Sequence, residues 1–373
     1  MKKVFFLIGS LQGGGAEKVL IDTVNCLDPE KYEITVQTLF DDGVHKERLS
    51  DKVRYKTIVK TKFALIKKAF GKLLFFYLPT SAVYDFFIKD SYDYEIAFLE
   101  GLPTKLISKS TERNSKKIAW VHTDLKDNPD SYRAFGSPQK EQAAYECFDK
   151  VFCVSKAVEA TFVEKYAPEK PKVGTQYNIL DDGAILEASK ENVILPTELR
   201  PCLISVGRLT QQKGYDRLLR IHKRLMEEGL MHSLLIIGEG ELRAEFEKYI
   251  EENDLSKSAF LLGFQKNPYK YISKADAFVC SSYAEGFSTV VTESVLCGTP
   301  VIATDVSGNR EPQEAPRCSV IVENNEEALY GALYEVIMNP ARLEEYRKSL
   351  WIKQAWVSKM NLLVAFEKSV FEG

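Results

Sequence analysis

Continuous apolar runs alternate with patches of helical periodicity along the first half of the chain. The run KKVFFLIGS (2–10) is apolar and ends in small residues, as the buried strands of parallel sheets do. In the next segment, EKVLIDTVNCL (17–27), the apolar positions follow one helical stripe. Strands separated by helices indicate a parallel sheet with helices on both faces. Further strands are predicted at 33–40, 94–100, 117–123 and 150–155.

A polar stretch closed by two prolines interrupts this pattern near residues 178–201. After it the alternation restarts, and strands are predicted at 202–209, 233–240, 259–264, 276–282 and 300–305. Helices are predicted at 213–228 and from the last strand to the end of the chain. We therefore predict two doubly wound α/β domains joined by a linker. Their expected bounds are 1–183 for the N-terminal domain, 184–355 for the C-terminal domain and 356–373 for a helix that crosses back to the N-terminal domain.

Length, charge and cysteine content narrow the class of protein. A chain of 373 residues suits two domains. A net charge of −3 argues against nucleic acid as a partner, because phosphate backbones demand clustered positive charge. The seven cysteines show no C-x-x-C pair and no metal-ligand spacing, which predicts reduced thiols in a cytoplasmic protein without a metal site. No apolar run approaches the roughly 20 residues of a membrane-spanning helix.

Three consecutive glycines, Gly13, Gly14 and Gly15, follow the first strand and open a helix. Glycine lets a ligand approach the backbone closely, and a helix N-terminus attracts anions. The segment is neither a Walker A loop nor the G-x-G-x-x-G dinucleotide fingerprint. A ligand-binding loop and a simple tight turn are both compatible with these glycines.

Two cations follow the first strand of the second domain. Arg208 and Lys213 flank a short polar loop in SVGRLTQQKGYDRLL (205–219), just before a predicted helix. Converging cations suit a diphosphate, whose charge must be neutralised as it departs, and solvated surface charges are the alternative. In open parallel sheets, ligands bind at the carboxyl ends of strands, and this loop lies at such an end.

Two glutamates eight positions apart stand in YAEGFSTVVTESVLCGTPVIATD (283–305). Ser288 is the predicted N-cap of a helix over 289–297 that is apolar on nearly every side. A carboxylate at Glu293 is costly to bury without partners, and the hydroxyls of a ribose would supply them. Glu285 precedes the helix, where an anion would meet backbone N–H groups. The spacing of the two carboxylates therefore suits a nucleotide sugar.

Taken together, EGFSTVVTE, the preceding SVGRLTQQKG and the following GTPVIATDVSGNRE resemble the retaining GT-B glycosyltransferases of family 4, the group 1 type. GGGAEK, YNILD (177–181) and IIGEG resemble other segments of that family, so that the resemblance covers essentially the whole chain. It implies the GT-B fold, in which two Rossmann-like doubly wound parallel-sheet domains face each other across a cleft. The N-terminal domain would bind the acceptor and the C-terminal domain the nucleotide sugar.

The resemblance also implies roles for the matching residues. The catalytic group would be Arg208 and Lys213 on the diphosphate, Glu285 on hydroxyls of the transferred sugar, and His122 beside that sugar. Glu293 would bind the ribose. The other donor-binding positions would be Gly14, Gly15, Gly207, Gly286, Phe287 and Ser288. Gly13 and Asp124 would lie on the acceptor side. For a lone histidine such as His122, a structural role is the alternative.

The implied reaction moves a sugar from a nucleotide-diphosphate sugar, by base rates UDP-linked, to a saccharide or lipid-linked saccharide. It retains the anomeric configuration and serves the biosynthesis of bacterial capsule, exopolysaccharide, lipopolysaccharide or related glycoconjugates. No D-x-D triplet occurs, which agrees with metal-independent catalysis without a cofactor. The alternative is a catalytically silent GT-B subunit that stabilises a partner transferase, and the presence of the motif residues weighs against it.

The segment VKTKFALIKKAFGKLLFFYLPTS (59–81) alternates lysines with large apolar residues. A basic amphipathic stretch can lie on an anionic membrane surface. The alternative is a domain helix whose aromatic face lies in the core. The resemblance favours the membrane, because many relatives extend lipid-linked saccharides. We therefore expect a cytoplasmic protein that is peripheral on the inner face of the plasma membrane through residues 59–78.

Overall fold

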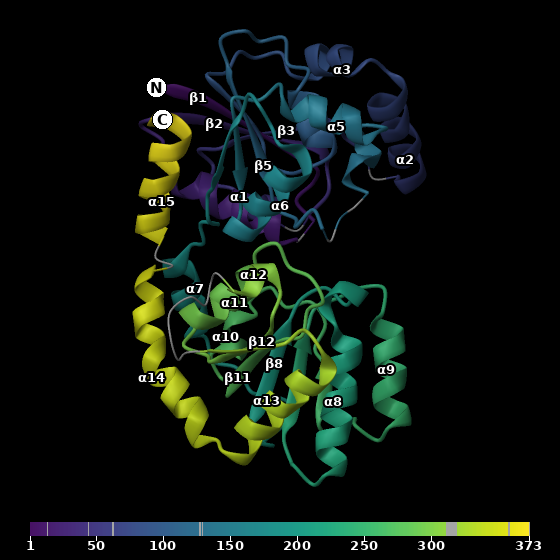
Figure 1. The fold of residues 1–373 in the computed structure, drawn as a ribbon, viewed down its shortest axis with the longest axis vertical. Coiled ribbons are helices and arrows are strands. Elements are labelled where there is room, and N and C mark those ends of the chain that lie inside the picture. The colour runs from purple at the N-terminus through teal and green to yellow at the C-terminus, as the bar shows by residue number, and fades with distance from the viewer. Residues whose placement is uncertain are drawn as a thin grey trace. The chain divides into compact units, whose positions relative to one another are not determined.

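The computed structural model describes residues 1–12, 14–43, 45–61, 63–126, 128, 130–310, 319–356 and 359–372. The chain divides into two compact units, Met1–Ile179 with Leu362–Gly373, and Leu180–Asn361. Each unit is a parallel sheet flanked by helices (Figure 1). This arrangement confirms the predicted class of two doubly wound α/β domains.

The first sheet has the strand order β3-β2-β1-β4-β5-β6-β7. Chain order reverses between β1 and β4, so the sheet is doubly wound. Its strands are β1 (Lys2–Ile8), β2 (Tyr32–Phe40), β3 (Arg54–Val59), β4 (Tyr94–Ala97), β5 (Lys116–Val121), β6 (Lys150–Cys153) and β7 (Lys172–Thr175). The helices along this part of the chain are α1 (Gly15–Cys26), η1 (Lys46–Arg48), α2 (Ala64–Lys72), η2 (Leu73–Tyr77), α3 (Thr80–Phe87), α4 (Leu102–Ile107), η3 (Ser131–Ala134), α5 (Pro138–Tyr145) and α6 (Lys156–Tyr166).

The second sheet repeats this plan with the order β10-β9-β8-β11-β12-β13. Its strands are β8 (Cys202–Val206), β9 (Ser233–Ile237), β10 (Ala259–Leu261), β11 (Ala277–Cys280), β12 (Val301–Thr304) and β13 (Ser319–Val322). The accompanying helices are α7 (Asp182–Ser189), η4 (Gln211–Lys213), α8 (Tyr215–Glu227), α9 (Arg243–Glu252), α10 (Tyr269–Ile272), α11 (Thr289–Leu296), α12 (Ser307–Arg310), α13 (Glu326–Met338) and α14 (Ala341–Trp356). The chain ends with α15 (Lys359–Glu367) and η6 (Lys368–Glu372).

The last residues of the chain pack on the first sheet. Lys2 Nζ donates a hydrogen bond to Phe371 O at 2.8 Å, and the two chain ends lie side by side (Figure 1). The Phe371 ring centroid lies 4.5 Å from that of Tyr32 and 5.0 Å from that of Tyr94. Because Lys2, Tyr32 and Tyr94 begin their strands, this segment covers the amino edge of the sheet.

Some predicted elements differ from the observed ones. No strand was predicted at β3, β7 or β13, which carry partly exposed residues and lack the continuous apolar run of a central strand. The polar stretch near 178–201 was predicted as a linker, yet it contains α7, which Asp181 caps by accepting a hydrogen bond from Ala184 N. Asp181 therefore starts a helix within a stretch whose polar composition and closing prolines had indicated a linker.

Two buried histidines form a hydrogen-bonded pair in the second unit. His232 Nδ1 lies 2.7 Å from Leu230 O, so Nδ1 carries the proton and Nε2 accepts from His222 Nδ1 at 2.8 Å. His222 Nε2 then accepts from Ser258 Oγ at 2.9 Å. Burial and the neighbouring His232 lower the pKa of His222 to about 3, and burial lowers the pKa of His232. Both rings are therefore neutral in the folded protein.

This pair predicts acid sensitivity of the second unit. The unfolded chain takes up protons on these histidines below a pKa of about 6.5, whereas the folded chain does not. The free energy of unfolding should therefore fall below pH 6.5, by up to about 1.4 kcal/mol per pH unit for His222 and in the same direction for His232. Urea unfolding between pH 7 and pH 5 measures this slope, and His222→Gln should flatten it. An unchanged slope in His222→Gln would contradict the assignment.

Candidate functional site

Three loops follow strands that are neighbours in the second sheet. They are 207–214 after β8, 281–288 after β11 and 305–308 after β12. The carboxyl ends of parallel strands share one edge of the sheet, so these loops meet at that edge. The predicted donor residues of the second domain, apart from Glu293, all lie in the first two loops.

The centre of this edge is a buried ion pair. Lys213 Nζ lies 2.6 Å from Glu285 Oε1, and the two side chains are 18% and 9% exposed. Ser282 Oγ donates to the same oxygen at 2.6 Å. Burial works against the charge of Lys213, but Glu285 outweighs burial, and the pKa of Lys213 is raised. Lys213 is therefore positively charged at neutral pH.

Arg208 brings a second positive charge to the pair. Its side chain is exposed, and its charge is close enough to Lys213 to oppose protonation of that lysine. Gly207 allows the close packing here, because a Cβ atom at this position would lie 2.8 Å from Tyr215 Oη and 3.3 Å from carbons of the Lys213 side chain. The structure thus brings Arg208, Lys213 and Glu285 together, as the sequence predicted.

The turn that carries Glu285 packs against α12. Ser307 Oγ and Gly308 N both donate to Glu285 O, at 2.7 and 2.8 Å, and Ser288 N donates to Gly308 O at 3.0 Å. A Cβ atom at Gly308 would meet Phe287 N at 2.7 Å, so only glycine permits this contact. Gly286 lies in the same turn. The backbone of this turn is therefore fixed before any ligand binds.

Ser288 occupies the predicted N-cap position of α11, but its side chain does not cap the helix. The residue is 2% exposed, and its Oγ atom has no hydrogen-bond partner within the described residues. A buried hydroxyl without a partner is unfavourable by about 1–3 kcal/mol. A ligand oxygen at the start of α11 would relieve this cost.

Glu293 differs from the expectation. It is 3% exposed within α11, as predicted, but it already interacts with other groups of the chain. Its burial therefore does not by itself require ribose hydroxyls, and its assignment to the ribose stays a prediction. The sequence could not show which neighbouring group would contact Glu293.

Two predicted residues of the first unit, His122 and Asp124, follow β5. His122 follows this strand, and its ring centroid lies 5.0 Å from that of Phe98. Burial lowers the pKa of His122 to about 3, so the imidazole is neutral, and its Nε2 atom has no hydrogen-bond partner within the described residues. Glu100 Oε1 accepts hydrogen bonds from the backbone nitrogens of His122 and Thr123, at 2.7 and 2.6 Å. A neutral histidine is held there with one ring nitrogen available.

The other first-unit candidates are less distinctive. Asp124 is buried, and its Oδ1 accepts a hydrogen bond from Lys126 N at 3.0 Å, which is a local turn contact. Gly14 and Gly15 begin α1, where the carboxylate of Glu17 lies against Gly14 and occupies the place of an anion. Gly13 lies outside the described residues.

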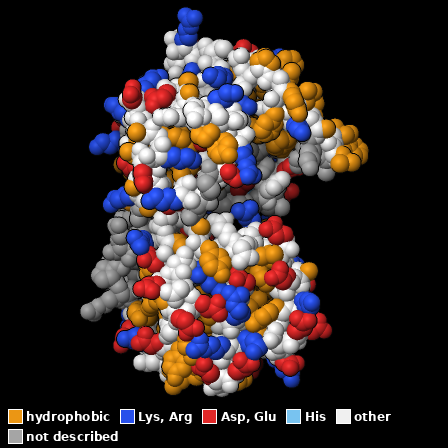
Figure 2. Space-filling model, turned by 45° about the vertical axis from the view of Figure 1, so that its right-hand side comes forward, with side chains coloured by type: hydrophobic (Ala, Val, Ile, Leu, Met, Phe, Trp, Pro, Cys, Tyr) orange, Lys and Arg blue, Asp and Glu red, His pale blue; other side chains and the backbone are white. Residues whose placement is uncertain are grey.

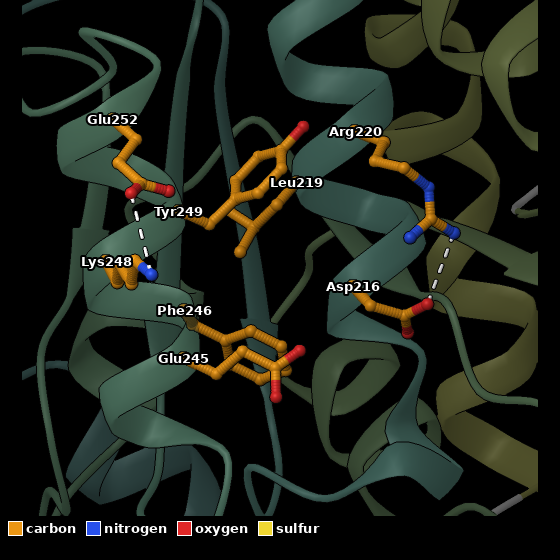
Figure 3. Close-up of a pocket in the computed structure, with 8 residues that line it drawn as sticks. All are labelled: Asp216, Leu219, Arg220, Glu245, Phe246, Lys248, Tyr249 and Glu252. Carbon is orange, nitrogen blue, oxygen red and sulfur yellow. Dashed lines mark hydrogen bonds and ion pairs between the residues drawn. The ribbon is translucent and has the colours of Figure 1, made fainter.

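A hollow of about 230 Å³ lies between α8 and α9, away from the ion pair (Figure 3). Its wall includes Leu219 and Phe246, and its rim carries charges that pair with one another, such as Asp216 with Arg220 at 3.2 Å. None of the predicted site residues lines it. We therefore place the candidate site at the carboxyl edge of the sheet, where the cations and the carboxylate converge.

The fold and this edge define a class: two-domain α/β proteins that bind ligands at the carboxyl ends of their strands. Residues 189–350 match the family described as "Glycosyl transferases group 1". The crystal structure of Anabaena HepE in complex with UDP and glucose aligns with a TM-score of 0.79 over 99% of both chains, at 18% identity.

Two relatives extend this comparison. The N-acetylgalactosamine-N,N'-diacetylbacillosaminyl-diphospho-undecaprenol 4-alpha-N-acetylgalactosaminyltransferase of Campylobacter jejuni is 27% identical over 358 residues, 93% of each chain. An uncharacterized glycosyltransferase of Methanocaldococcus jannaschii is 31% identical over 227 residues, 56% of this chain and 54% of its own. Residues 189–350 are therefore similar to the group 1 glycosyl transferases, and the chain has the GT-B fold.

The close backbone packing at this edge yields a prediction. Gly214 has φ +64°, and a Cβ atom there would lie 2.0 Å from Ser281 O. Gly298 has φ +78°, but nothing lies within 4 Å of its Cβ position. Gly298→Ala should lower the free energy of unfolding by about 1–2 kcal/mol through backbone strain alone. Gly214→Ala should lower it further, because it also displaces the loop before Glu285.

Urea unfolding of the two variants measures this difference. Because both glycines have a positive φ, Gly298→Ala is a matched control for the strain. Equal losses in the two variants would show that the contact between Gly214 and Ser281 does not restrain the loop.

Proposed function

We propose that this enzyme is a retaining, metal-independent glycosyltransferase of family 4. It would transfer a sugar from a UDP-sugar to a lipid-linked saccharide during synthesis of a bacterial surface polysaccharide or glycoconjugate. The observation that carries the donor assignment is the ion pair of Lys213 with Glu285, beside Arg208. The name of the C. jejuni relative, which includes diphospho-undecaprenol, and the UDP complex of HepE support the acceptor and donor classes.

Each group at the edge has a proposed part in donor binding. Lys213 uses one of its three N–H donors on Glu285, so two are available for the diphosphate. Arg208 adds charge on the same side. The hydrogen bonds of Lys213 and Ser282 both reach Oε1 of Glu285, and its Oε2 would accept from a sugar hydroxyl. The Ser288 hydroxyl would bind a phosphate oxygen.

The proposed step is a substitution with retention at the anomeric carbon. The acceptor oxygen bonds to this carbon as the carbon–oxygen bond to the β-phosphate breaks, and UDP departs with that electron pair. The acceptor proton passes to the departing phosphate oxygen on the same face. Lys213 and Arg208 stabilise the negative charge that develops on UDP, which is the part a divalent ion plays in other transferases. We propose no cofactor.

Nucleotide binding gives the most accessible test. UDP or a UDP-sugar at a hundredfold excess over its dissociation constant should stabilise the folded protein by about 2.7 kcal/mol. This corresponds to a rise in melting temperature of about 5–10 °C for a domain of this size. Glu293→Ala should lose this rise, because we assign Glu293 to the ribose, and Glu251→Ala on α9 should keep it.

The rise is to be measured against the melting temperature of each unliganded variant, so that a loss of stability is not mistaken for a loss of binding. If no nucleotide or nucleotide sugar raises the melting temperature of the wild-type protein, the transferase proposal fails. A silent subunit that stabilises a partner transferase would then be the better account.

The acceptor proposal includes a membrane surface on the first unit. Large hydrophobic side chains gather on that unit (Figure 2). Between 63 and 86 the large hydrophobic side chains that are 43–84% exposed are Phe63, Leu65, Ile66, Phe70, Leu73, Phe76, Tyr77, Leu78 and Phe86. The alternative, in which the aromatic face of this segment lies in the core, holds only for residues such as Phe75. An exposed apolar group of this size is unusual in a protein without a partner.

Lysines accompany these apolar side chains. The ammonium groups of Lys72, Lys89 and Lys105 lie 6.0, 5.3 and 5.4 Å from the rings of Tyr77, Phe86 and Phe76. No acidic residue occurs in 59–78. Lys62 and the side chains of Lys67 and Lys68 lie outside the described residues.

Such a surface suits the interface of an anionic bilayer. No helix within the described residues is long and apolar enough to cross a membrane. We therefore propose peripheral attachment at the cytoplasmic face of the plasma membrane.

Vesicle sedimentation tests this attachment. The wild-type protein should co-sediment with vesicles of phosphatidylglycerol and phosphatidylcholine at low salt, and less at high salt. Replacing Leu65 and Tyr77 by Ser should weaken binding at least about tenfold, since each large side chain contributes about 1.5–3 kcal/mol when buried. Ile194→Ser, which removes a 94% exposed side chain of the second unit, is the control. Absence of co-sedimentation at low salt would rule out the membrane surface.

A further inference from the structure

The loop between β11 and α11 is held in place by hydrogen bonds that its backbone carbonyl groups accept. Each carbonyl from Ser281 to Glu285 accepts at least one hydrogen bond from another part of the second unit. The donors are Arg217 to Ser281 O, Arg217 and Thr304 to Ser282 O, Asn324 to Tyr283 O, Gln212 to Ala284 O, and Ser307 with Gly308 to Glu285 O. Because five successive carbonyl groups are fixed in this way, the backbone of the loop is held in one conformation.

Arg217 makes the largest contribution to this set. Its Nε and Nη2 atoms donate to Ser281 O at 2.9 and 2.6 Å, and Nη2 also donates to Ser282 O at 2.8 Å. Nη2 further contacts Asn324 Oδ1 at 2.8 Å. The guanidinium carbon lies 4.0 Å from the ring centroid of Tyr283. The Arg217 side chain therefore contacts three consecutive residues of the loop, 281–283.

The position of Arg217 is unusual for a cation. The residue is 2% exposed, and it forms no ion pair with a carboxylate within the described residues. Burying a guanidinium without a counter-ion is unfavourable, and here backbone carbonyls and an aromatic face take the place of that ion. The next arginine of α8, Arg220, is exposed and pairs with Glu326 at 2.8 Å. The two arginines of this helix thus serve different purposes.

A short path of contacts links Arg217 to the carboxylate of Glu285. Arg217 fixes the carbonyl of Ser282, and the hydroxyl of the same serine donates to Glu285 Oε1 at 2.6 Å. Lys213 Nζ donates to the same oxygen at 2.6 Å. A shift of the loop would therefore move the carboxylate relative to Lys213.

We propose that Arg217 is a positioning residue for the donor sugar: through the 281–285 loop and Ser282 it sets the location of the Glu285 carboxylate. The inference rests on the proposed function, in which Glu285 binds the sugar and other groups bind UDP. It adds a selective consequence, because loss of Arg217 should weaken recognition of the sugar and leave recognition of UDP in place.

The experiment compares the dissociation constants of UDP and of UDP-glucose, UDP-galactose, UDP-N-acetylglucosamine and UDP-N-acetylgalactosamine. The wild-type protein identifies which UDP-sugar binds tighter than UDP. For that donor, Arg217→Met should remove most of the difference in affinity between the UDP-sugar and UDP. It should also lower kcat/KM of donor hydrolysis by about 10–100-fold, which is the effect expected when a group such as the Glu285 carboxylate is slightly misplaced. The dissociation constant of UDP should change by less than about threefold, because groups other than Glu285 bind UDP. Arg220→Met is the matched control and should change neither quantity.

Two further variants separate positioning from folding. Arg217→Lys keeps a donor near the carbonyls without the planar fork, so its loss should be intermediate. Ser282→Ala removes the hydrogen bond to Glu285 and leaves the carbonyl contacts, and it should lower the affinity for the sugar in the same direction. If Arg217→Met does not fold, these two variants carry the test, and sugar recognition unchanged in both would overturn the inference.

A double-mutant cycle tests the route through Glu285. In a Glu285→Ala background, Arg217→Met should alter the affinity for the UDP-sugar by less than about threefold, because its effect acts through the missing carboxylate. A full additional loss in that background, or an equal loss for UDP and UDP-sugar, would show a general structural role and overturn the inference. If the wild-type protein binds neither UDP nor any UDP-sugar, the proposed function fails, and the inference fails with it.

Discussion

The ion pair between Lys213 and Glu285 is the interaction on which the second unit's site depends. A lysine and a glutamate that are both mostly buried must stay together, because each charge is strongly unfavourable there without the other. A buried pair adds little net stability compared with apolar side chains of similar size. Its presence at the carboxyl edge therefore points to a role in ligand chemistry. The packing around the pair holds the two charged side chains next to each other.

Glycine and backbone hydrogen bonds supply that packing. Gly214 and Gly308 let their segments approach the 281–288 loop at backbone distance, where a side chain would push them apart. Gly207 makes room for the side chains of Tyr215 and Lys213. The first unit shows a related arrangement, in which Glu100 holds the backbone beside His122 and the ring stays neutral. In both units the strands provide the edge, and the polar contacts between loops provide the geometry at that edge.

The sequence predicted the elements with continuous apolar runs, such as β1 and β9, because strands buried on both faces leave a clear pattern. It also predicted that Arg208, Lys213 and Glu285 would meet, because the carboxyl ends of parallel strands share an edge. It did not predict the hydrogen bond of Ser282 to Glu285 or the contacts of Arg217. Arg217 lies on α8 more than 60 positions from the carbonyls it contacts, and no local pattern encodes such contacts.

A crystal structure of the protein with UDP would show whether the carboxyl edge of the second sheet is the donor site. We expect diphosphate oxygens within about 3 Å of Lys213 Nζ and of the Arg208 guanidinium. We also expect the ribose beside Glu293 and a phosphate oxygen on Ser288 Oγ. A nucleotide bound elsewhere, with the pair of Lys213 and Glu285 free of ligand, would contradict the assignment of this edge as the donor site.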